Sequence, residues 1–156
     1  MTLLAEVEKW IADDPDPATA QTLREAVARN DLEFLQSCFS GFLEFGTAGL
    51  RGPLGPGPSR MNRAVVSRAA LGLAAFMKSR GLDSIVVGYD ARHGSRQFAE
   101  DTCELMQGAG ITAHLMPREL PTPVLAYAVK ALAVSAGVMV TASHNPPQDK
   151  IGRAHV

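Results

Sequence analysis

Residues 84–89 read Ser-Ile-Val-Val-Gly-Tyr and lead directly into Asp90. A short, almost wholly apolar run that ends at an acidic residue is typical of a β-strand covered on both faces. Residues 136–141, Ala-Gly-Val-Met-Val-Thr, repeat this pattern, and residues 111–116 offer a further strand between the two. The three runs predict the central strands of a buried sheet.

Helical patterns separate these strands. Residues 62–80 form one predicted helix, which Asn62 can cap and Gly81 can end. Ser95 can cap a second helix, and residues 122–133 form a third. Strands that alternate with helices predict an α/β fold, here a three-layer α/β/α sandwich around a mostly parallel, mixed sheet. The inward side chains expected in the first helix are Val65, Ala69, Leu73 and Phe76.

The chain divides into an extension and a main domain. Residues 1–44 predict a short helical extension, because apolar residues recur at helical spacing and Asp16 followed by Pro17 is a typical helix start. Residues 45–149 then form the main domain. Its first part, residues 45–58, is crowded with glycine and proline, so we expect a shaped loop without a regular element.

Composition narrows the class of protein. Of the 156 residues, 46% are hydrophobic and 20% are charged, as in a soluble globular protein. The formal net charge is −1 and no Lys/Arg cluster stands out, which argues against nucleic acid as a partner. Cys38 and Cys103 show no metal-ligand spacing, so we expect two reduced thiols in a cytoplasmic protein. The longest apolar stretch is interrupted by Lys130, which argues against a membrane span.

Polar clusters fall at the predicted strand ends, where α/β sheets place their sites. They are residues 47–51, residues 90–92 and residues 141–145. Ser143 in the last cluster is a candidate hydroxyl nucleophile beside His144, on a turn that the following prolines keep out of a helix. A hydroxyl that carries a phosphoryl group needs cations nearby, and Arg51 and His144 meet that need.

Each cluster also has a plainer explanation. The Ser-His-Asn-Pro turn at residues 143–146 can be an ordinary turn in which Ser and Asn bond local backbone groups. The glycine-rich loop can be a structural crossover instead of an anion-binding nest. Asp90 and Arg92 can form a local ion pair of about 0 to 1 kcal/mol.

The order of the motifs resembles a known family. Residues 45–52 (Phe-Gly-Thr-Ala-Gly-Leu-Arg-Gly), residues 87–92 (Val-Gly-Tyr-Asp-Ala-Arg) followed by Ser95, and residues 141–146 (Thr-Ala-Ser-His-Asn-Pro) are similar to the first domain of the α-D-phosphohexomutases, the phosphoglucomutase/phosphomannomutase family. The resemblance covers residues 43–149 and is closest to the branch of long phosphoglucomutases and phosphopentomutases.

The resemblance implies a reversible phosphoryl transfer within a sugar phosphate, of the glucose 1-phosphate to glucose 6-phosphate type, through a bisphosphorylated sugar. Ser143 would be the phosphorylated residue, and one oxygen of its phosphate would bind Mg²⁺. His144 would assist proton transfer. A glucose 1,6-bisphosphate-type activator is implied as well.

The same resemblance assigns the neighbouring side chains. Arg51 would stabilise the phosphoryl group, and Thr47 and Asn145 would shape the phosphate and substrate pocket. Asp90 and Arg92 would contact and orient these residues without contacting the substrate themselves. Neither the preferred sugar nor the oligomeric state follows from these residues.

The chain departs from the family after Asp149. The family's Asp-x-Asp-x-Asp metal loop does not occur, and Lys150 stands where the family has Asn, so the family's catalytic lysine is not assigned. We hypothesise that residues 150–156 are a non-native tail, because Ile-Gly-Arg-Ala-His-Val can be encoded by ATC GGA AGA GCA CAC GTC, the beginning of a common sequencing adapter. On this hypothesis the domain is incomplete and the fragment is inactive.

The sequence therefore predicts the amino-terminal part of a phosphosugar mutase with a small-molecule sugar phosphate as substrate. Phosphomannomutase and phosphopentomutase activity are alternatives for the parent enzyme. A non-catalytic phosphosugar-binding module that uses the glycine-rich loop and Arg51, or a purely structural α/β domain, are the alternatives from other classes.

Overall fold

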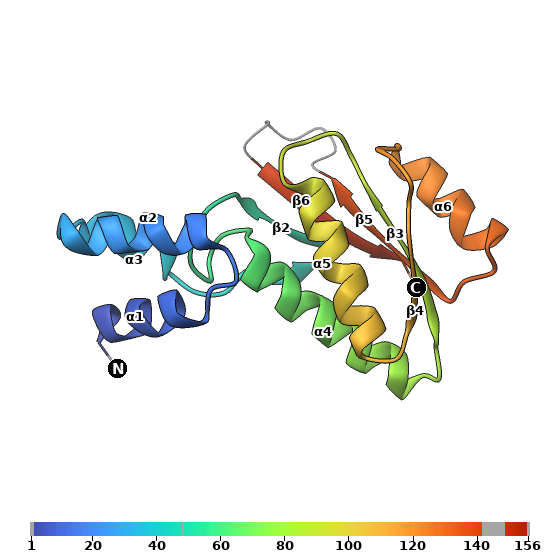
Figure 1. The fold of residues 1–156 in the computed structure, drawn as a ribbon, viewed down its shortest axis with the longest axis horizontal. Coiled ribbons are helices and arrows are strands. Elements are labelled where there is room, and N and C mark those ends of the chain that lie inside the picture. Colours follow the sequence, from blue (N-terminus) through green and yellow to red (C-terminus); the bar gives the residue numbers. More distant parts are fainter. Residues whose placement is uncertain (1, 48, 142–148, 156) are drawn as a thin grey trace.

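The computed structural model describes residues 2–47, 49–141 and 149–155 (Figure 1). The described part alternates strands with helices after a helical leader, as predicted. Its elements are α1 (Leu3–Asp13), α2 (Pro17–Ala28), α3 (Leu32–Cys38), β1 (Phe45–Gly46), β2 (Gly49–Pro53), α4 (Arg63–Ser79), β3 (Ser84–Tyr89), α5 (Ser95–Gly108), β4 (Thr112–Leu115), α6 (Thr122–Ala131), β5 (Ala136–Thr141) and β6 (Asp149–His155).

The strands form a mixed sheet in the order β1-β2-β6-β5-β3-β4. Strands β4, β3 and β5 are parallel, whereas β6, β2 and β1 are joined to them by antiparallel pairings. The predicted strands at residues 84–89 and 136–141 are confirmed in full, and the one at residues 111–116 is shorter by a residue at each end. The α/β class is therefore confirmed.

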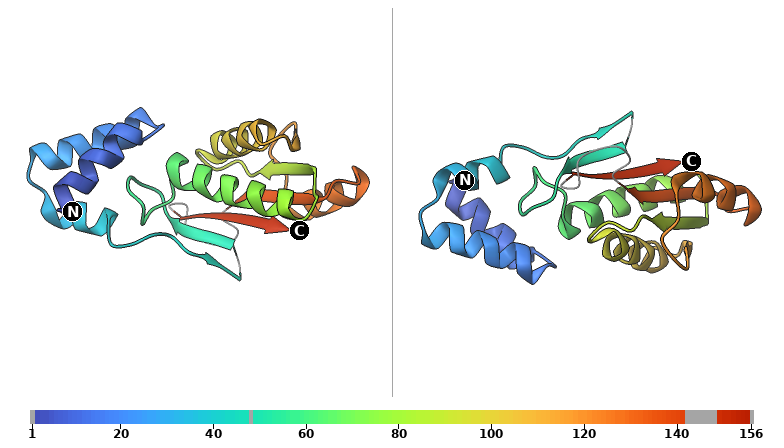
Figure 2. Two further views of the ribbon diagram at one scale, coloured as in Figure 1. Left: turned by 90° about the horizontal axis from the view of Figure 1, so that it is seen from below. Right: turned by 90° about the horizontal axis from the view of Figure 1, so that it is seen from above.

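Helices cover both faces of the parallel strands (Figure 2). On β3, Ile85 packs with residues of α4 and α5, whereas Val86, the next residue, packs with Leu125 of α6. Successive side chains of a strand point to opposite faces, so α4 and α5 form one outer layer and α6 the other. This arrangement is the predicted three-layer sandwich.

Helix α4 begins and ends as predicted but presents a different face. Asn62 is its N-cap, and Gly81 follows its end with a φ of +69°. Phe76 was expected inside but is 43% exposed, so that prediction is wrong. The helix packs against α5 as well as the sheet, and this turns its inner face toward α5. The buried face consists of Val65, Ala70, Ala74 and Met77.

Two further local predictions are corrected. Ser95 does not cap α5 but is its first residue, after Gly94 in a left-handed conformation. Part of the glycine-rich stretch is also regular, because β2 is a strand that pairs with β1 and β6. Strand β6 lies about a hundred residues further along the chain, and nothing in the local sequence shows that this partner is present. Residues 54–61 remain an irregular loop, as expected.

The leader, residues 1–44, packs onto the main domain. Thr2, Asp16 and Asp31 cap its three helices with side-chain oxygens. Its buried side chains, among them Val7 and Leu35, belong to the same hydrophobic cluster as side chains of the main domain. The described side chains of the leader therefore extend the core of the main domain.

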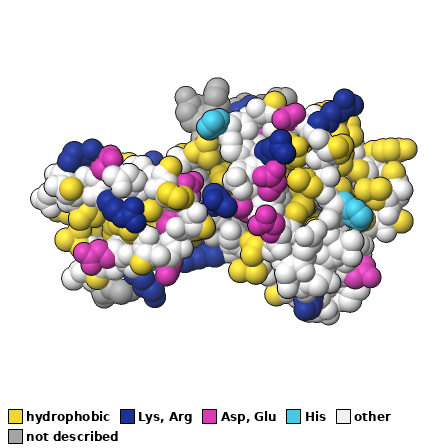
Figure 3. Space-filling view, in the orientation of Figure 1, with side chains coloured by type: hydrophobic (Ala, Val, Ile, Leu, Met, Phe, Trp, Pro, Cys, Tyr) yellow, Lys and Arg dark blue, Asp and Glu magenta, His cyan; other side chains and the backbone are white. Residues whose placement is uncertain are grey.

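The cysteines and the surface show no unusual feature. Cys38 and Cys103 are both buried and free. Lys/Arg and Asp/Glu side chains are interspersed on the face shown in Figure 3. Among the residues that the structure describes, no helix has the length and apolar character to span a bilayer.

Candidate active site at the carboxyl edge of the sheet

The first residues of two predicted polar clusters, Asp90 and Thr141, lie side by side where β3 and β5 end. Tyr89 and Val140 are paired in these parallel strands, and the Asp90 amide donates a hydrogen bond of 3.1 Å to the Val140 carbonyl. Asp90 and Thr141 therefore leave the sheet side by side. The carboxyl edge of parallel strands is the usual place for a ligand in such folds.

The Asp90 side chain contacts Ser95 and Arg92. Its Oδ1 accepts hydrogen bonds from the Ser95 hydroxyl (2.6 Å) and from the Arg92 amide (3.1 Å). Its Oδ2 lies 3.7 Å from Arg92 Nε, in an ion pair that is partly exposed. A charged acceptor with this many partners has a fixed direction, so it gives the edge a rigid frame.

Ser95 is the residue that the sequence argument placed wrongly. It is fully buried and serves as a partner of Asp90, not as a helix cap. The spacing of the two residues, with Ser95 in the first turn of the helix that follows Asp90, is the signal that could have found this contact.

Arg51 and Thr141 lie in one row of residues that are paired across neighbouring strands of the sheet. Arg51 pairs with Ile151 of β6, and Ile151 pairs with Thr141 of β5. Residues in one row point to the same face, and two strand spacings put their Cα atoms about 10 Å apart. Arg51 is exposed and forms no ion pair with another described residue. Its guanidinium is thus available to an anion on the α6 side of this edge.

The structure does not bring the other described site residue, Thr47, to this row. Thr47 is exposed on the turn between β1 and β2, at the opposite end of β2 from the carboxyl edge. Ser143, His144 and Asn145 lie outside the described residues. The described geometry therefore fixes the surroundings at Thr141, two residues before Ser143 in the sequence.

The described residues do not fit a Mg²⁺ site by themselves. They contain no group of three or more His, Cys, Asp or Glu side chains close enough to hold a metal ion. The Asp90 carboxylate at the edge is already engaged with Ser95 and Arg92. Mg²⁺ prefers several oxygen ligands in octahedral geometry, which one engaged carboxylate does not supply.

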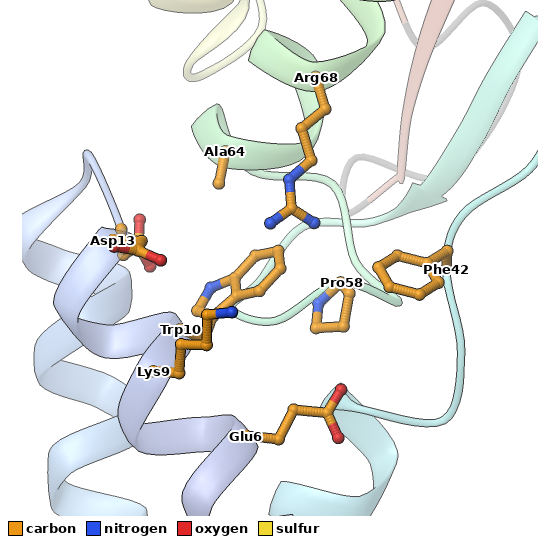
Figure 4. Close-up of a pocket in the computed structure, with 9 residues that line it drawn as sticks. Glu6, Lys9, Trp10, Asp13, Phe42, Pro58, Ala64 and Arg68 are labelled. Carbon is orange, nitrogen blue, oxygen red and sulfur yellow. The ribbon is translucent and has the colours of Figure 1, made fainter. Parts of the chain in front are cut away.

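A pocket lies between the leader and α4, away from this edge (Figure 4). Its volume is about 180 Å³, below the roughly 300–1,000 Å³ of typical ligand sites. The Arg68 guanidinium lies over the Trp10 ring at 4.7 Å. The Trp10 Nε1 is fully buried and has no hydrogen-bond partner among the described residues, so it is not accessible to a pocket ligand.

Comparison with known proteins identifies the fold and the family. Residues 43–151 match the domain described as phosphoglucomutase/phosphomannomutase, alpha/beta/alpha domain I. A solved structure from Thermus thermophilus, described as a putative phosphomannomutase, superposes with a TM-score of 0.68 at 33% identity, over 73% of this chain and 25% of that one. The chain belongs to the phosphoglucomutase/phosphomannomutase family, as the motifs predicted.

Two curated relatives show how much of a family member is present. A "Probable phosphomannomutase" of Haemophilus influenzae is 60% identical over 90 residues, which is 57% of this chain and 19% of the relative. Mouse phosphopentomutase is 35% identical over 154 residues, which is 92% of this chain and 25% of the relative. The second match extends into the leader. The chain spans a quarter or less of the length of these relatives.

Proposed function

We propose that this chain is the phosphoserine-bearing part of a phosphosugar mutase that converts glucose 1-phosphate to glucose 6-phosphate. The observation that supports it most is the row joining Arg51 to Thr141, next to the Asp90 frame, in a domain of the mutase family. The motif with Ser143 begins at Thr141, so the proposed nucleophile comes two residues after this edge in the sequence.

The proposed step moves one phosphoryl group. The bond between phosphorus and Ser143 Oγ breaks while a bond forms between phosphorus and a hydroxyl oxygen of the sugar phosphate, giving a bisphosphorylated sugar. The hydroxyl proton passes to His144. Arg51 offsets the negative charge on the transferring group, a role in which one fixed donor is worth about 100- to 1,000-fold in rate. Return of the other phosphoryl group to Ser143 completes the isomerisation.

The sugar is the least constrained part of the proposal. The relatives are named for mannose and pentose phosphates, so these two compete with glucose phosphate as substrates. A glucose 1,6-bisphosphate-type molecule is the proposed activator, because it can phosphorylate Ser143. Mg²⁺ bound through phosphorylated Ser143, and a cytoplasmic location, remain predictions from the resemblance.

The 156 residues by themselves are proposed to be inactive as a mutase. They match a quarter or less of the relatives' length, and the described residues offer no metal cluster. Residues 150–156 also remain a proposed non-native tail. Residues 149–155 pair as β6, but strand pairing uses backbone groups that almost any sequence supplies. The DNA that encodes these residues, with its downstream reading frame, tests this point.

The experiment uses a chimera, called the joined enzyme below, in which residues 1–149 replace the matching first part of mouse phosphopentomutase, whose match covers 92% of this chain. We expect it to isomerise a sugar 1-phosphate, which tests whether residues 1–149 supply a working phosphoserine domain. Arg51→Ala should lower kcat/KM about 100-fold or more. Arg80→Ala is the matched control, because Arg80 ends α4 over the Phe76 ring and its loss should leave kcat/KM unchanged. An active Arg51→Ala enzyme would contradict the proposed role.

A further inference from the structure

The loop between β2 and α4 caps the carboxyl end of α3, the last helix of the leader. The last carbonyls of any helix lack partners within it. In α3 these include Ser37 and Cys38, and the Ser59 hydroxyl donates to both carbonyls, at 2.9 Å and 2.7 Å. The Ser59 amide donates a further bond of 3.2 Å to Cys38. Helix α3 is therefore capped by a residue about twenty positions away in the sequence.

Neighbouring loop residues strengthen this contact. Arg60 donates from its guanidinium to the Ser37 hydroxyl (2.8 Å) and lies 5.3 Å from the Phe34 ring centroid. A cation at the carboxyl end of a helix is favourable there. Gly57 lies so close to the Cys38 carbonyl that a Cβ would overlap it. The loop and the leader fit together without room for adjustment.

The other end of the same loop is fixed to β2. The Met61 amide donates to the Pro53 carbonyl at 2.8 Å, and the Gly55 amide donates to the Met61 carbonyl at 3.2 Å. The buried Asn62 side chain donates to the carbonyls of Gly55 (2.9 Å) and Gly57 (2.7 Å). Pro53 ends β2 two residues after Arg51. A displacement of the loop is therefore passed to the strand that carries Arg51.

We propose that the leader positions Arg51, and that Ser59 is the positioning residue through which it does so. The inference rests on the proposed function, since it gives Arg51 its role. The leader then has a task in the reaction, which it performs through the loop that carries Ser59. Loss of the Ser59 hydroxyl weakens the attachment of the loop to α3, and the added motion of the loop then reaches the end of β2.

The first test measures hydrogen exchange in the purified 156-residue chain and needs no activity. Ser59→Ala should raise exchange about fivefold, the effect of one lost hydrogen bond, at whichever of the Arg51 and Gly52 amides faces β6, relative to Val86 in the sheet centre. Ser40→Ala is the matched control, because its hydroxyl also donates to Ser37 (3.4 Å) but stays within the leader. Unchanged exchange in Ser59→Ala, or an equal rise in Ser40→Ala, overturns the proposal.

A milder variant guards against general unfolding. If Ser59→Ala also raises exchange at Val86, Arg60→Met is measured in its place. This variant removes the hydrogen bond to Ser37 and keeps an aliphatic side chain. The same rise at the β2 amide that faces β6 is expected, and its absence overturns the proposal. Ser59→Thr keeps a hydroxyl and should restore protection.

The second test uses the joined enzyme and a double-mutant cycle. If Ser59 acts through Arg51, Ser59→Ala lowers kcat/KM about fivefold in the parent and has no effect once Arg51 is already Ala. Equal effects in both backgrounds overturn the coupling. An inactive joined enzyme would count against the proposed mutase function, while the exchange result would still decide whether the leader fixes the strand.

Discussion

Two glycines show how differently one residue type is used in this chain. Gly57 has a φ of +87° and abuts the Cys38 carbonyl, whereas Gly72 lies in the interior of α4 with open space around it. Gly57→Ala should destabilise the chain by about 2 to 4 kcal/mol through strain and overlap. Gly72→Ala should stabilise it by about 0.5 to 1 kcal/mol, because the helix loses a flexible residue. Urea unfolding of both variants checks the pair, and equal effects would contradict the loop's close fit.

The Cys103 thiol gives stability a dependence on pH. Burial, aided by Glu100 and Glu104, raises the pKa of Cys103 to about 11 from its ordinary 9.0. The unfolded chain then gives up this proton first as the pH rises, so the thiol's contribution is present below pH 9 and lost toward pH 11. The free energy of unfolding should fall more steeply across this range in the parent than in Cys103→Ala. Parallel pH profiles for the two proteins would refute the assignment.

At the scale of elements, Arg63 joins three parts of the chain. Its Nε and an amino group donate to the Asp101 carboxylate at 2.7 Å and 2.8 Å, and its other amino group donates to the Pro15 carbonyl at 3.3 Å. The Asp101 side chain is only 7% exposed, so its negative charge needs a partner inside the protein. Asp101 also raises the pKa of Arg63. These hydrogen bonds of Arg63 connect α4 to α5 and to the leader.

Removal of the guanidinium should therefore be costly. Arg63→Ala leaves a buried carboxylate with Gln97 as its remaining partner among the described residues, and should lower the free energy of unfolding by about 2 to 3 kcal/mol. Arg96→Ala is the control, since its pair with Glu100 has a similar length, 2.8 Å, but lies on the surface. Thermal unfolding that shifts equally in both variants would be inconsistent with this explanation.

The elements that could be predicted from sequence are those whose cause is local. Strands β3 and β5 follow from apolar runs, and the start of α4 follows from Asn62. Strand β2 was missed because its pairing depends on a distant partner, β6. The inner face of α4 was misjudged because tertiary contact with α5, not the helical period alone, sets its rotation.

At the scale of the whole molecule, strand order decides where the candidate site residues lie. Residue types at strand ends named Arg51, Asp90 and Arg92, and the parallel pairing of β3 with β5 gathers the last two beside Thr141. The row from Arg51 to Thr141 depends on strand order, which no local pattern records. The same is true of the leader, whose capping by Ser59 appears only when the chain is folded.

The most direct test of the account is phosphoryl labelling of Ser143 in the joined enzyme. Incubation with Mg²⁺ and glucose 1,6-bisphosphate carrying labelled phosphate, followed by peptide mapping, should place the label on Ser143. Ser143→Ala should remove it, whereas Ser79→Ala, which loses an exposed hydroxyl at the end of α4, should keep it. Label that never reaches Ser143, or that persists in Ser143→Ala, would contradict the proposed mutase chemistry.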